Sequence, residues 1–238
     1  MIAAWAASLT DGQIEQYLEQ IPGLGAVLYP HQYRLSELLD RPTVAYAPSP
    51  GAAGMAADYP FTGMILGRDE PNVATTGPSG SRISAGESRA QYDAALAEVR
   101  NHPAWVVPAS LVSTASWWRA LLFRNHFDDY YHQVRGVPEV AWACSRVRRG
   151  EIRAVRETYD GTFLMVPALF RSWPHCWLQA NPEWYVRFAL DNPGTHLALW
   201  SLAEVDAPHQ PFGLFGKKGE MTRVGHAVRQ ALKVGGTP

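Results

Sequence analysis

The feature of this sequence that most constrains its fold is the repeated alternation of short apolar runs with helical segments along 238 residues. Runs of strand length occupy residues 1–7, 25–30, 43–47, 61–66, 104–108, 127–132, 162–168 and 195–202. Helices are expected at residues 10–21, 33–39, 87–101, 116–124, 137–157, 182–190 and 221–232, and loops at 48–54 and 75–86. This order favours a parallel sheet whose strands are joined by helical crossovers.

Eight such strands in a chain of this length predict one closed (β/α)8 barrel, a TIM barrel, over residues 1–238. No linker-like stretch divides the chain, so a single domain is expected. Neither a Gly-x-Gly-x-x-Gly motif nor a phosphate loop follows the early strands. That absence weakens the alternative of a doubly wound nucleotide-binding fold.

Composition excludes several classes of partner. The net charge is −1, so neither a nucleic acid nor an anionic membrane surface is expected to bind. There is no apolar run of about 18 residues, which a membrane span requires. Cys144 and Cys176 are too far apart to form a metal motif, and no metal or cofactor is expected. The first residues lack the regions of a classical signal peptide, as in a cytoplasmic or virion-associated protein.

Two adjacent carboxylates follow the fourth expected strand. The apolar run ending at Leu66 is followed by Gly67, and Asp69 and Glu70 come next, before Pro71. Neighbouring carboxylates repel each other, which raises the pKa of one of them and suits a general acid. Carboxyl ends of barrel strands form the mouth where active sites lie. In the alternative interpretation, the aspartate caps a turn and the glutamate is solvated.

The same mouth is expected to collect aromatic and polar side chains from several strand ends. The chain has nine tryptophans, and aromatic rings in a cleft stack on the apolar face of a sugar. A carbohydrate is therefore the expected partner. Taken singly, each ring more often belongs to the core, and only their joint placement on one rim favours a binding site. The candidate binding residues are Trp5, Tyr29, His31, Tyr46, Asn72, Tyr130, Tyr131, His132, Trp200 and Glu204.

These motifs resemble the (β/α)8 glycoside hydrolases whose acid/base glutamate ends strand four, usually within Asn-Glu-Pro. The equivalent segment here is Arg68-Asp69-Glu70-Pro71-Asn72. Further similar features are Tyr92 on the next helix, Trp117-Trp118, Asp128 with His132, Trp200 on the last strand, and the tail at residues 212–219. The resemblance implies a polysaccharide substrate, such as a cell-wall glycan, with Glu70 as the general acid/base.

The seventh strand departs from that family pattern. Retaining enzymes of the clan carry a nucleophilic glutamate there, whereas residues 163–170 contain no carboxylate. One interpretation is a similarity to hexosaminidases, in which the substrate's acetamido group attacks; Asp69 would then orient that group and Tyr130 or Tyr131 would donate to it. In the other, the barrel only binds glycan or is a structural module of a larger, phage tail-like assembly. A lyase or isomerase is a third, weaker alternative.

Overall fold

The computed structural model of this protein describes residues 1–68, 83–109, 111–112, 140–143, 162–166, 182–204 and 213–235. Its strands belong to one sheet with the order β5-β4-β3-β2-β1-β9-β8-β7-β6, and every neighbouring pair for which a register is recorded is parallel. The strands are β1 (Ile2–Trp5), β2 (Gly25–Leu28), β3 (Thr43–Ala47), β4 (Gly63–Leu66), β5 (Trp105–Pro108), β6 (Leu111–Val112), β7 (Val140–Ala143), β8 (Phe163–Val166) and β9 (Thr195–Leu199).

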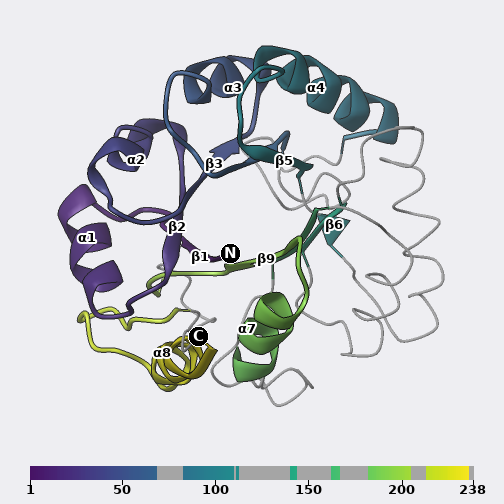
Figure 1. Ribbon diagram of the computed structural model, residues 1–238. Helices are drawn as coiled ribbons and strands as arrows, with labels where there is room; N and C mark the ends of the chain where they lie inside the picture. Colours follow the sequence, from purple (N-terminus) through teal and green to yellow (C-terminus); the bar gives the residue numbers. More distant parts are fainter. Residues whose placement is uncertain are drawn as a thin grey trace.

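The sheet closes into a barrel, seen end-on in Figure 1. Strands β5 and β6 stand at opposite ends of the sheet order, yet only Ala109 and Ser110 separate them in the chain. Strand β5 also contacts β7 directly. Together, β5 and β6 form one interrupted barrel strand, which gives eight parallel strands around a ring. The expected (β/α)8 barrel is confirmed.

Helices surround this ring on its outer side (Figure 1). Two of them begin with a capping box, in which the Thr10 side chain pairs with Gln13 and the Ser84 side chain with Glu87. None of the described helices is long and apolar enough to cross a membrane. The helices are α1 (Asp11–Glu19), the short 3-10 helix η1 (Pro30–Gln32), α2 (Leu35–Leu38), α3 (Pro50–Ala56), α4 (Ala85–Glu98), α7 (Pro182–Asp191) and α8 (Arg223–Gly235).

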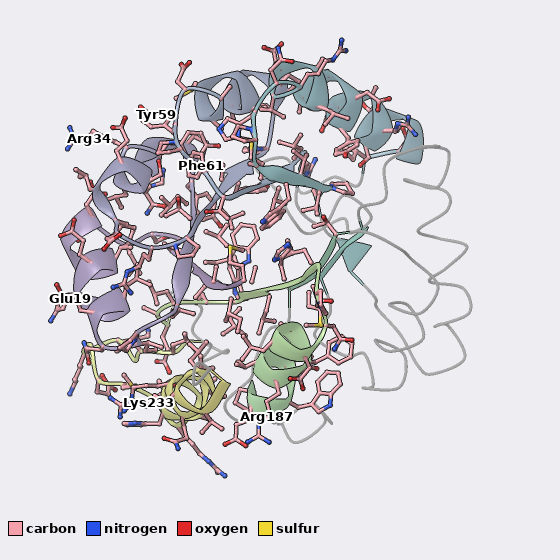
Figure 2. All side chains as sticks on the ribbon, viewed as in Figure 1. Glu19, Arg34, Tyr59, Phe61, Arg187 and Lys233 are labelled. Carbon is pink, nitrogen blue, oxygen red and sulfur yellow. The ribbon has the colours of Figure 1, made fainter. Side chains whose placement is uncertain are left out.

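Strands β1 to β4 are buried on both faces, which agrees with their continuous apolar character. Successive side chains of a strand alternate between its faces. On β1, Ala3 and Trp5 lie in the cluster inside the barrel, while Ile2 and Ala4 lie in the outer cluster under the helices. Charged side chains occupy the outermost surface, and Figure 2 shows this for the labelled residues Glu19, Arg34, Arg187 and Lys233.

The loop expected at residues 48–54 is wrong, because helix α3 begins at Pro50. The Ser49 side chain accepts a hydrogen bond from the Ala52 backbone N–H at 3.3 Å, which caps the helix. Proline fits the first turn of a helix, and alanine has the highest helix propensity. Glycine and proline content indicated a loop, but the cap and the buried alanines outweigh it.

The helix expected at residues 137–157 is wrong over Val140–Ala143, which form β7, the sixth strand of the barrel. This strand pairs in parallel with β8, with Trp142 opposite Met165. Valine and tryptophan favour strands, whereas arginines at helical spacing further along suggested a helix. The sixth strand was expected at residues 127–132, which lie outside the described residues.

Gly63 gives the barrel room for a large side chain near its amino end. A methyl group at Gly63 would collide with the indole of Trp105. We expect Gly63→Ala to lower the free energy of unfolding by about 1–3 kcal/mol, because overpacking forces the neighbouring indole out of place. Denaturant unfolding measures this change. Gly12→Ala in α1 is the control, since nothing lies within 4 Å of its added methyl group. Equal unfolding midpoints for Gly63→Ala and the wild type would contradict this packing.

Candidate active site at the carboxyl end of the barrel

Aromatic side chains from four adjacent strands meet at the carboxyl end of the barrel. Trp5 ends β1, Tyr46 lies near the end of β3, and Tyr29 and Trp200 directly follow β2 and β9. The Trp5 ring is central, with its centroid 5.1 Å from Tyr46, 5.6 Å from Trp200 and 5.9 Å from Tyr29. His31 adjoins Tyr29 at 6.2 Å. These five residues are called the mouth cluster, and all five are among the binding candidates named from the sequence.

Two residues of the mouth cluster are buried and form its floor, and the other three are accessible to solvent. Trp5 is 1% exposed and Tyr46 is 8% exposed, so both are buried beneath their neighbours. Tyr29 and Trp200 are half-buried, and His31 is exposed. The peptide bond after Trp200 is cis. A ligand at this mouth would therefore touch Tyr29, His31 and Trp200 first, while the floor rings hold them from below.

The floor also carries a polar group that lacks a partner. The indole N–H of Trp5 is buried and has no hydrogen-bond partner within the described part of the chain. An unpaired buried donor costs about 1–3 kcal/mol, so such groups call for a water or a ligand atom. This donor belongs to the central ring of the mouth cluster.

Gln32 connects the chain segments that carry two of the rings. Its side-chain oxygen accepts from the Tyr29 backbone N–H at 3.0 Å. Its amide nitrogen donates to the carbonyl oxygens of Ala6 and Leu9, both at 3.0 Å. Gln32 is 1% exposed, and its bond to Ala6 is fully buried. These bonds fix the end of β2 against the segment that follows Trp5 on β1.

Tyr33 supports the third strand in the same way. Its hydroxyl donates to the backbone carbonyl oxygen of Tyr46 at 2.7 Å. The ring packs in the outer layer against Phe61, with centroids 5.1 Å apart, and Figure 2 shows Phe61 and Tyr59 beside α2 and α3. Burial raises the pKa of the Tyr33 phenol well above its ordinary value, so the hydroxyl remains a donor at neutral pH.

The fourth strand ends at the same rim. Gly67 follows β4 with a φ of 96°, a conformation that favours glycine, and its N–H donates to the Ala47 carbonyl at 2.9 Å. On the other side, the Ala109 N–H donates to the Leu66 carbonyl at 2.7 Å. The strand that precedes the two acids is therefore held between β3 and β5, and half-buried Arg68 follows Gly67.

Six candidate residues lie outside the described residues, so their roles remain predictions: Asp69, Glu70, Asn72, Tyr130, Tyr131 and His132. Glu204 is described and half-buried, and its backbone N–H donates to the Phe215 carbonyl at 2.8 Å. Strand β8 is the seventh strand of the barrel, and its residues Phe163–Val166 contain no carboxylate. The segment after Val166, where a strand-seven acid would stand, lies outside the described residues, so the absence of that acid remains a prediction.

Sequence reasoning missed Gln32 and Tyr33. The bonds from Gln32 to Ala6 and Leu9 and from Tyr33 to Tyr46 reach backbone carbonyls of other chain segments, and no local motif reveals such partners. It also missed the opposite end of the barrel, where the rings of Trp105 and His196 stack with centroids 4.3 Å apart. In the described part of the chain, no three His, Cys, Asp or Glu side chains gather as metal ligands would.

No protein-family model matches the chain, and no curated protein matches its sequence. Among solved structures, it is similar to a GH128 (subgroup II) endo-β-1,3-glucanase from Sorangium cellulosum, with a TM-score of 0.64 and 16% identity over 97% of this chain and 98% of that one. A GH128 (subgroup II) endo-β-1,3-glucanase from Pseudomonas viridiflava gives 0.59 and 11% over 96% and 95%. ScGas2 in complex with compound 8 gives 0.59 and 11% over 100% and 63%. Similarity at these identities establishes the barrel fold.

Tyr33→Phe tests the buried hydroxyl through alkaline stability. The folded state keeps the Tyr33 proton to a higher pH than the unfolded state, because burial raises the pKa. The resulting stability is complete below about pH 10 and is lost as pH rises further. We expect the wild type to lose unfolding free energy more steeply than Tyr33→Phe above about pH 10, measured by denaturant titration at several pH values. Tyr59→Phe is the control, and equal slopes for wild type and Tyr33→Phe would contradict the assignment.

Proposed function

We propose that this chain is a glycoside hydrolase-like barrel that binds a polysaccharide at the mouth cluster. The observation that carries this proposal is the group of rings on neighbouring strand ends, with Trp5 at its floor and Tyr29 and Trp200 partly exposed. Half-exposed aromatic rings offer flat apolar faces on which a sugar ring stacks. The Trp5 N–H, which has no partner among the described residues, supports the same site, since a sugar hydroxyl or a bound water would satisfy it.

Glu70 is the proposed general acid/base, with Asp69 as its partner. Both follow β4 closely, and β4 ends at the rim that carries the mouth cluster. Active-site residues of (β/α)8 barrels lie at these strand ends. Glu70 would protonate the glycosidic oxygen as the bond to the leaving sugar breaks. Its carboxylate would then accept a proton from the water molecule that attacks the sugar.

Two observations favour two different classes of substrate. The two GH128 neighbours are described as endo-β-1,3-glucanases, which favours a β-1,3-glucan. The lack of a carboxylate on β8 favours a substrate that supplies its own nucleophile, such as a 2-acetamido sugar oriented by Asp69. A β-1,3-glucan has no acetamido group. Assays with both glycans separate the two, because only the acetamido sugar permits the substrate-assisted route.

The second candidate function is a glycan-binding barrel without hydrolytic activity. The specific observation in its favour is the same apolar seventh strand, Phe163–Val166, where a double-displacement enzyme carries its nucleophile. Such a module would keep the aromatic mouth and bind polysaccharide as part of a larger assembly. Binding without turnover by the wild type distinguishes it from the enzyme.

Replacing Glu70 by Gln tests the catalytic proposal. The variant keeps the shape of the side chain but cannot transfer a proton, so hydrolysis should fall by about 100- to 10,000-fold. Reducing-sugar release from β-1,3-glucan and from an acetamido-sugar polymer measures it. Glu19→Gln on the outer face of α1 is the control, because Glu19 is exposed (Figure 2). Wild-type rates in Glu70→Gln would overturn the role of Glu70, and binding without any wild-type hydrolysis would favour the second candidate.

Replacing Trp200 by Ala tests the binding site. Loss of the stacking face should weaken glycan affinity by about fivefold, since one aromatic contact contributes on the order of 1 kcal/mol. Isothermal titration with oligosaccharides measures the change. Tyr59→Ala is the control, because Tyr59 lies in the outer layer near Phe61 and away from the mouth cluster. If Trp200→Ala binds as tightly as the control, the glycan does not occupy this mouth.

A further inference from the structure

Three neighbouring strands carry the rings of Trp5, Tyr29 and Tyr46, so their mutual arrangement depends on how the strand ends are held together. Ring contacts alone are weak constraints, because an aromatic pair adds little stabilisation beyond the burial of its rings. Side chain to backbone hydrogen bonds in a buried environment are more directional. Two consecutive residues, Gln32 and Tyr33, supply such bonds to all three strands.

Gln32 holds the first two strand ends. It accepts from the backbone N–H of Tyr29 and donates to the carbonyl of Ala6, the residue after Trp5. A third bond, to the carbonyl of Leu9, fixes the segment beyond. Both amide hydrogens and the amide oxygen are therefore used. A side chain of the same length without this donor and acceptor pair cannot replace it.

Tyr33 holds the third strand end. Its hydroxyl reaches the backbone carbonyl of Tyr46 at 2.7 Å, and its ring lies outside the barrel against Phe61. Gln32 and Tyr33 are adjacent at the end of η1, so a displacement of this turn would move the ends of β1, β2 and β3 together.

We propose that Gln32 and Tyr33 are positioning residues for the mouth cluster: they set the arrangement of its rings and thereby its affinity for a glycan. The first part concerns the rings and stands on the hydrogen bonds alone. The second part rests on the proposed function, because it requires a glycan at this mouth. Neither residue touches the ligand; both act through the backbone of the residues that carry the rings.

Tyr33→Phe is the primary variant, because it removes one oxygen and keeps the buried ring. Gln32→Met is the second, since it keeps the length of the side chain and removes the amide. Tyr59→Phe is the matched control: it removes a hydroxyl from a ring that contacts Tyr33, 6.1 Å away, without altering a bond to the mouth cluster. Far-ultraviolet circular dichroism checks that each variant retains the barrel.

Near-ultraviolet circular dichroism reads the ring arrangement, because coupled aromatic rings in fixed geometry give strong signals. Trp5→Phe shows which part of the spectrum comes from the mouth cluster. We expect Tyr33→Phe and Gln32→Met to reduce that part and to weaken oligosaccharide binding by about threefold to tenfold, the loss that corresponds to one or more hydrogen bonds. Tyr59→Phe should change neither.

The results separate the two proposals. If Tyr33→Phe lowers only the melting temperature, while its near-ultraviolet spectrum and affinity match Tyr59→Phe, the residue is merely structural and the inference is overturned. If Gln32→Met fails to fold, Tyr33→Phe still decides. If the wild type binds no glycan, the proposed function fails; a spectrum changed in Tyr33→Phe then still supports the positioning role, and an unchanged spectrum overturns it.

Discussion

The structure depends on one constraint: its parallel strands are apolar on both faces and must be covered on both. Closure of the sheet buries the inner face, and the ring of helices buries the outer one. Ala3 and Trp5 of β1 pack inside the barrel, whereas Ile2 and Ala4 pack under the helices. Because all strands run in the same direction, closure also brings every carboxyl end to one rim. The location of the candidate site follows from this geometry.

At that rim, the chain combines buried support with accessible rings. The floor ring of Trp5 contacts Tyr46 and Trp200, and buried hydrogen bonds from Gln32 and Tyr33 hold the strand ends below. A rigid support of this kind lowers the entropy lost when a ligand binds, because the contacting rings are already in place. Similarity over whole chains to two endo-β-1,3-glucanases establishes the barrel fold, and any function must be argued from this chain's own residues.

The sequence predicted the barrel and the mouth cluster for a definite physical reason. Chain order alone places residues such as Tyr29 and Trp200 near the carboxyl ends of strands, and parallel strands share a rim. Prediction from the sequence failed where local composition and tertiary context disagree. Helix α3 was expected to be a loop because of its glycine and proline content. Strand β7 was expected to be part of a helix, because arginines follow Val140–Ala143. The bonds from Gln32 to Ala6 and Leu9 were not predictable, because these carbonyl groups are distant in sequence.

The most direct test of the central claim is a crystal structure of the protein with a bound oligosaccharide, obtained with Glu70→Gln to prevent turnover. We expect a sugar ring to stack on Tyr29 or Trp200 at the carboxyl end of the barrel. We also expect the side chain of residue 70 to lie within hydrogen-bonding distance of a glycosidic oxygen. A sugar bound away from the mouth cluster, or residue 70 directed to solvent on the outside of the barrel, would contradict this claim.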